Sequence, residues 1–141
     1  MDRLRTVTHF LLRVVAGFLF LHHGGQKLFG WFGGMPGGVT AQPFTQPWIG
    51  GVLDFFGGLL LVIGLFTQPV AFILAGEMAV AYFQVHQPRG LLPIQNHGEP
   101  AALYAFIFLF FAAHGAGEWS LDALRARGRG PAPSPKEALV N

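Results

Sequence analysis

The sequence predicts an all-α polytopic membrane protein, folded as an antiparallel bundle of four transmembrane helices with both termini in the cytoplasm. Of the 141 residues, 52% are hydrophobic and only 11% are charged, whereas soluble domains carry about 25% charged residues. The apolar residues form four continuous runs, each near the ~20 residues that a helix needs to cross the hydrocarbon. A transmembrane β-barrel would show alternation instead. The short chain predicts one membrane domain, residues 1–124.

Each apolar run is expected to be a helix, because the backbone finds no water to bond with in lipid. The four spans are predicted at residues 7–29, 48–66, 69–86 and 99–114. Pro69 suits the first turn of the third span. Only Thr67 and Gln68 separate the second and third spans, which forces an antiparallel hairpin. The N-terminus resembles a signal peptide, but Arg13 interrupts its apolar region and no small-residue cleavage site follows, so we expect a retained first span.

The distribution of lysine and arginine predicts the orientation, because cytoplasmic loops carry an excess of positive charge. Only Lys27 and Arg89 belong to the predicted outer side. The predicted inner side holds Arg3, Arg5, Arg125, Arg127, Arg129 and Lys136. This places both termini in the cytoplasm, with residues 125–141 as a basic, proline-rich, flexible cytoplasmic tail. The expected location is a bacterial cytoplasmic (inner) membrane. The scattered basic residues form no face for nucleic acid.

The chain has no cysteine, which excludes disulfides, thiol catalysis, iron–sulfur clusters and thiolate zinc sites. The sequence assigns no catalytic residue.

Charged residues inside the predicted spans need a reason, because each costs about 2.5–3.5 kcal/mol to insert. Asp54 lies at the depth of His23 and Lys27, and we expect it to pair with one of them. Glu77 lies near the bilayer centre, and Arg13 is in the inner half of the first span. These two are predicted to form an intramembrane ion pair.

Titratable and polar residues gather near the outer ends of the spans, which indicates a ligand site or a proton path. The predicted outer-leaflet cluster comprises His22, His23, Lys27, Asp54, Gln84, His86 and Glu99. The alternative is that these groups only join helices, without any chemistry.

Haem, a metal ion and a quinone are the three candidate ligands for this cluster. Haem would need axial histidines at similar depth; His23 and His86 are the best candidates, but His86 lies close to the interface. A metal could use His22, His86, His97 and Glu99, although their spacing is not diagnostic. A quinone needs only an apolar slot with one or two hydrogen-bond donors, which phenylalanine walls with His23 and Lys27 would supply.

Several motifs resemble those of DoxX-type membrane proteins. The first is "RVVAGFLFLHHGGQKLFGWFGG", with an arginine followed by HG-x-x-KLFG and a glycine-rich loop. The others are "DFFGGLLLVIGLFTQPVA", "HGEPAALY" and "WSLDAL", so the resemblance covers about residues 10–124. The acid of the second span is Asp54 where glutamate is expected, and His22 is an additional histidine. The matching positions are Arg13, His23, Gly24, Lys27, Asp54, Gly57, Gly58 and Glu99.

The resemblance implies a four-helix membrane subunit associated with redox systems, some of them quinone-linked. Its partners would be the lipid bilayer and other membrane subunits. In this hypothesis His23 and Lys27 donate hydrogen bonds to a ligand oxygen, while Asp54 and Glu99 hold charge and relay protons. One alternative is a non-catalytic accessory subunit of a larger assembly. Another is a transporter of protons or a small solute, with the Arg13–Glu77 pair as its gate.

Overall fold

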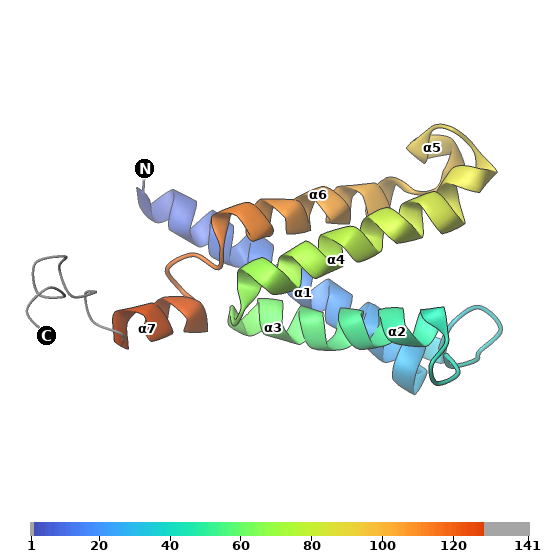
Figure 1. Cartoon of the computed structure of the whole chain (residues 1–141), viewed down its shortest axis with the longest axis horizontal. Coiled ribbons are helices and arrows are strands. Elements are labelled where there is room, and N and C mark those ends of the chain that lie inside the picture. The colour runs from blue at the N-terminus through green and yellow to red at the C-terminus, as the bar shows by residue number, and fades with distance from the viewer. Residues whose placement is uncertain (1, 129–141) are drawn as a thin grey trace, which may run out of the picture.

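The computed structural model describes residues 2–128 and folds them as a bundle of helices (Figure 1). Within these residues the only strand-like feature is an isolated bridge between Met35 and Val39. The α-helices are α1 (Asp2–Phe29), α2 (Gln46–Val52), α3 (Gly58–Ile63), α4 (Thr67–Ala81), α5 (Pro93–Asn96), α6 (Glu99–His114) and α7 (Leu121–Gly128). The other helical turns are η1 (Trp31–Gly33), η2 (Leu53–Gly57), η3 (Tyr82–His86) and η4 (Gln87–Arg89).

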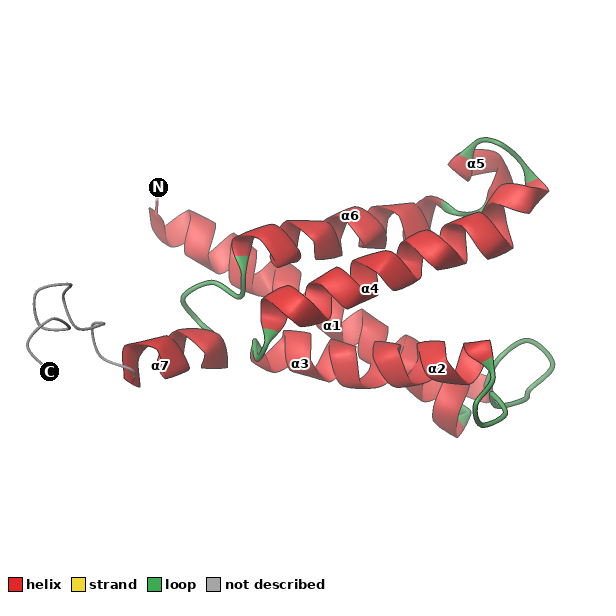
Figure 2. Cartoon of the chain, viewed as in Figure 1, coloured by secondary structure: helices red, strands yellow, loops and turns green. Residues whose placement is uncertain are grey.

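Three continuous helices in the described chain are long and apolar enough to cross a membrane, namely Asp2–Phe29, Gln46–Ile63 and Thr67–Arg89. They contain most of the first three predicted spans. The fourth predicted span, residues 99–114, coincides with α6, an apolar helix that is shorter than these three. The protein is therefore a helical membrane protein, and α6 packs along α4 (Figure 2).

The hairpin between α3 and α4 lies earlier in the chain than the sequence predicts, at residues 64–66 instead of Thr67 and Gln68. The second span ends at Ile63 rather than at residue 66, because Gly64 turns into the left-handed region with φ 70°, where glycine has no steric penalty. The third begins at Thr67 rather than at residue 69. The Asp122 carboxylate of α7 accepts hydrogen bonds from the backbone N–H groups of Phe66 and Thr67, at 2.9 Å each. It thus caps α4 from another element.

The first span lies unusually close to the second. An ideal Cβ built on Gly17 would lie 2.7 Å from the Gly58 carbonyl oxygen, and one on Gly24 would collide with the Phe55 backbone. Small residues allow this backbone approach. The buried core continues from this contact to α4 and α6, through Phe20, Leu61, Leu74, Phe108 and Phe111.

Two π-helical turns interrupt the spans, η2 in the second and η3 in the third. Such turns are rare and occur frequently at functional sites. At the other end of the molecule, α7 includes the first residues of the predicted tail, so residues 125–128 are helical. The rest of that tail, with Arg129 and Lys136, lies outside the described residues.

Candidate functional site

The last turns of α1 bring a lysine onto the acid of the second span. Lys27 Nζ lies 2.6 Å from Asp54 Oδ2, which confirms one of the two contacts predicted for Asp54. The Asp54 side chain is 2% exposed and that of Lys27 is 28% exposed. Asp54 belongs to the π-helical turn η2, and the buried Gly24 of α1 lets that turn approach. The pair thus joins two spans at a point of close backbone contact.

Glu77 of α4 belongs to the same group. An ideal Cβ on Gly50 would lie 2.9 Å from Glu77 Oε1 and 3.4 Å from Lys27 Nζ, so both side chains occupy the space above that glycine. The Glu77 and Asp54 carboxyl groups lie within hydrogen-bonding reach of each other. Lys27, Asp54 and Glu77 are therefore one cluster, contributed by three spans, which we call the Lys27 cluster.

The predicted ion pair between Arg13 and Glu77 is wrong. The Arg13 guanidinium instead donates to the carbonyl oxygens of Leu61 at 2.6 Å, Val62 at 3.0 Å and Trp119 at 2.6 Å. It therefore lies at the end of α3, near the start of α4 at Thr67. Glu77 is ten residues further along α4, which is about 15 Å at the rise of a helix. Because Arg13 and Glu77 lie at different depths, they cannot form the mid-membrane gate of the transporter alternative.

A groove of about 480 Å³ opens beside the Lys27 cluster, between α2–η2 and α4–η3. Its polar lining is Lys27, Gln46, Glu77 and Gln84, and the side chain of Gln46 donates a hydrogen bond to that of Gln84. Its remaining lining is Pro47, Ile49, Gly50, Leu53, Ile73, Val80, Ala81 and Val85. We call it the Lys27 groove. It has apolar walls with charged groups at one place, as ligand sites usually have.

Four members of the predicted outer-leaflet cluster do not line the Lys27 groove. His22 contacts the Phe18 carbonyl oxygen through Nδ1 at 2.7 Å and packs against Phe32. The exposed His23 packs edge-on against Phe20, with ring centroids 6.1 Å apart. His86 Nδ1 lies 3.1 Å from the Asn96 carbonyl oxygen.

Glu99, the fourth, is exposed in the first turn of α6 and lines a separate groove with residues of α1. The seven predicted residues therefore do not form one site. Of the seven, Lys27 and Gln84 line the Lys27 groove, and Asp54 is paired with Lys27 beside it. Among residues 2–128, no group of three or more His, Asp or Glu residues is placed to hold a metal ion.

Sequence reasoning missed Glu77 and Gln46 as parts of the site. A signal for Glu77 was present, because Gln84 follows it by one heptad on the same helical face. Two residues on one face line the same side of a span, so placing Gln84 in the cluster required Glu77 there too. Gln46 gave no such signal, since it precedes the predicted second span.

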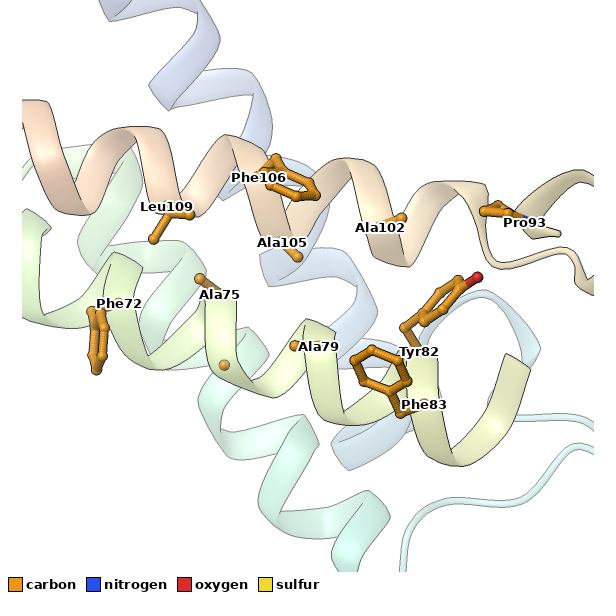
Figure 3. Close-up of a pocket in the computed structure, with 11 residues that line it drawn as sticks. Phe72, Ala75, Ala79, Tyr82, Phe83, Pro93, Ala102, Ala105, Phe106 and Leu109 are labelled. Atoms are coloured by element: carbon orange, nitrogen blue, oxygen red, sulfur yellow. The ribbon is translucent and has the colours of Figure 1, made fainter. Parts of the chain in front are cut away.

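A second groove of about 550 Å³ lies between α4 and α6 (Figure 3). Its lining is Phe72, Ala75, Gly76, Ala79, Tyr82, Phe83, Pro93, Ala102, Ala105, Phe106 and Leu109. It has no charged side chain, and the Tyr82 hydroxyl at one end already accepts a hydrogen bond from Asn96 Nδ2 at 3.3 Å. This apolar groove is large enough for a ligand, but it has no free polar group that would orient one.

The fold and the buried charges define a helical membrane protein whose spans meet around ionisable side chains. The DoxX family model matches residues 8–87, more than half of the chain, and the chain belongs to this family. That match includes Arg13, Lys27, Asp54 and Glu77. A protein of Haemophilus influenzae, described only as uncharacterized, is 43% identical over 114 residues, covering 79% of this chain and 85% of its own length. No solved structure matches the chain.

Proposed function

We propose that this DoxX-family chain is a membrane-embedded subunit of a redox complex in the bacterial inner membrane, and that it binds a quinone in the Lys27 groove. The observation that carries this proposal is the position of Lys27, whose ammonium group lines a groove with apolar walls. A quinone head group presents carbonyl oxygens that need donors, and its isoprenoid tail needs an apolar path.

The donors available in the groove fit such a head group. An ammonium group has three N–H donors, and the structure shows one directed to Asp54. The others are available to a ligand oxygen, and the amide groups of Gln46 and Gln84 line the same groove. His23 does not line it, so the donor role falls to Lys27. The walls formed by Ile49, Leu53 and Ile73 would contact the tail.

The membrane arrangement that we propose for this function has four crossings, with α6 inserted beside α4. Both termini then lie in the cytoplasm, as the basic residues at the two ends of the chain favour. Lys27, near the end of α1, would place the groove in the outer leaflet. A membrane-impermeant maleimide should label Val39→Cys, but not Arg3→Cys, in intact spheroplasts, because the wild-type chain has no cysteine of its own.

The binding proposal is tested by thermal unfolding of the purified protein in mild detergent, with and without short-chain ubiquinone and menaquinone analogues. We expect a quinone to raise the melting temperature of the wild type and to leave that of Lys27→Met unchanged. Phe106→Leu in the α4–α6 groove is the matched control and should respond like the wild type. If neither analogue stabilises the wild type, or if only Phe106→Leu loses the response, the proposed site is wrong.

A second candidate is an accessory subunit without a ligand, favoured by large apolar side chains exposed in the loops beyond the spans. Phe32 is 75% exposed, Phe44 85% and Leu91 79%. These would dock on a neighbouring subunit. Native gel electrophoresis of solubilised membranes should show the chain in a large complex that Phe44→Ser dissociates. Migration of the wild type as a monomer or small homo-oligomer would contradict this role.

A further inference from the structure

The Lys27 cluster places two carboxyl groups beside one ammonium group in the interior of a membrane protein. Asp54 is 1% exposed, and its partner in the ion pair is Lys27. Glu77 approaches from α4, and its Oε1 lies with Lys27 Nζ in the space above Gly50. The two acids thus come from two spans, and the lysine beside them comes from a third.

The hydrogen bonds within the cluster are incomplete. Asp54 Oδ2 accepts from Lys27, but Asp54 Oδ1 and Glu77 Oε2 are both buried without a donor from the described part of the chain. An ionised carboxylate is only an acceptor, whereas a protonated one also donates. The two carboxyl groups are within hydrogen-bonding reach, so a hydrogen bond between them requires one proton.

The charge of the cluster leads to the same requirement. With both acids ionised, Lys27 neutralises one charge and the other remains buried, at a high cost in free energy. The other titratable group that faces Asp54 is His23 of α1, which is exposed. Interactions of an exposed side chain are screened, so His23 compensates a buried carboxylate less than the paired Lys27 does.

We propose that Asp54 and Glu77 form a proton-binding site that holds one proton between their carboxyl groups, with Lys27 balancing the remaining negative charge. The site opens to the Lys27 groove through Glu77, which lines it. Proton binding needs no ligand in the groove, so this site exists whether or not a quinone binds. Two carboxyl groups that share a proton are a recognised arrangement where like charges lie close together.

The test is infrared spectroscopy of the ligand-free protein in lipid nanodiscs at neutral pH. A protonated carboxyl group has a C=O stretching band that a carboxylate lacks, and the band shifts in D₂O. We expect this band in the wild type, its loss in both Glu77→Gln and Asp54→Asn, and its retention in Glu118→Gln, whose acid is exposed elsewhere. Size-exclusion chromatography identifies variants that fail to fold; should Asp54→Asn fail, Glu77→Gln, which keeps the Lys27–Asp54 ion pair, carries the test.

His23→Gln separates the two possible sources of balancing charge. If Lys27 balances the pair, His23→Gln retains the wild-type band. A band that is absent from the wild type and appears only in His23→Gln would overturn the proposal, because His23 would then carry the second positive charge. So would a band that persists in both Glu77→Gln and Asp54→Asn. Because no quinone is present, these outcomes are independent of the quinone-binding test.

Discussion

α1 carries two cations into the protein, Arg13 near its middle and Lys27 in its last turn, and the two have different partners. Arg13 is 1% exposed and donates to three backbone carbonyl oxygens, two at the end of α3 and one just before α7. Lys27 pairs with a carboxylate, and its ammonium group also lines a groove. Arg13 thus joins segments of the backbone, whereas Lys27 forms a site with ionisable side chains.

This difference shows that a buried charge in a span is not by itself evidence of a site. The partners of Arg13 are carbonyl oxygens, which cannot titrate; that of Leu61 also accepts a hydrogen bond from the Gly64 N–H at 3.2 Å. Lys27 pairs with the Asp54 carboxylate, and Glu77 lies beside this pair. Within the described residues, one oxygen of each acid lacks a donor, and Arg13 Nε likewise lacks an acceptor. The feature that separates the Lys27 cluster from the Arg13 contacts is therefore that its unpaired atoms belong to ionisable acids beside a groove.

The largest expected loss of stability is that of a substitution at Arg13. Arg13→Leu removes three charge-assisted hydrogen bonds and leaves buried carbonyl oxygens unpaired, so we expect a loss of about 3 kcal/mol or more in unfolding free energy. Thermal unfolding followed by circular dichroism in mild detergent measures it. The exposed Arg5→Leu is the control. Equal melting temperatures for the two variants would contradict a structural role for Arg13.

At the Lys27 cluster, Lys27→Met is expected to lower the unfolding free energy by about 2 kcal/mol. This is less than the 3–5 kcal/mol lost when a fully buried pair is broken, because Lys27 is partly exposed. The double variant Lys27→Met/Asp54→Asn should recover part of this loss, since it removes the unpaired carboxylate as well. A double-mutant cycle should give a coupling of about 1–2 kcal/mol. Additive effects of the two substitutions would mean that the pair contributes no stability.

Both the Arg13 contacts and the Lys27 cluster depend on the close approach of α1 to the second span. Gly24→Ala would drive a methyl group into the Phe55 backbone, and we expect a loss of about 1–2 kcal/mol, typical of overpacking. Gly76→Ala on α4 is the control, because nothing lies within 4 Å of its ideal Cβ. It should be neutral, or more stable by up to ~1 kcal/mol through helix propensity. Chemical denaturation can rank the two, and the reverse order would contradict the contact.

The smallest expected change in stability is that of Glu77→Gln. Glutamine resembles a protonated glutamic acid in shape and hydrogen bonding, so a Glu77 that shares a proton should tolerate it within about 1 kcal/mol. The melting temperature in detergent is again the measurement. A loss as large as that of Lys27→Met would indicate that Glu77 acts as a charged partner of the lysine.

Much of the fold follows from residues that are local in the sequence. The apolar runs predict the first three spans within a few residues, and matching the depths of charges reduces the partners of Asp54 to Lys27 or His23. The boundary errors arise at the α3–α4 hairpin, where the turn uses Gly64 in the left-handed region and a cap from Asp122. Asp122 is more than fifty residues from that turn, and a local pattern does not contain such a partner.

The candidate site was harder to predict because depth along a helix does not give direction around the bundle. The sequence alone determined that the chain is helical, that it belongs in a membrane, and that Asp54 needs a cationic partner, Lys27 or His23, in an apolar medium. Tertiary structure decided that Arg13 binds backbone carbonyl oxygens, that Glu77 joins Asp54, and that His86 and Glu99 lie apart. The physical reason is that hydrophobicity and charge are properties of each residue, whereas the partner of a buried group depends on how the helices rotate and approach one another.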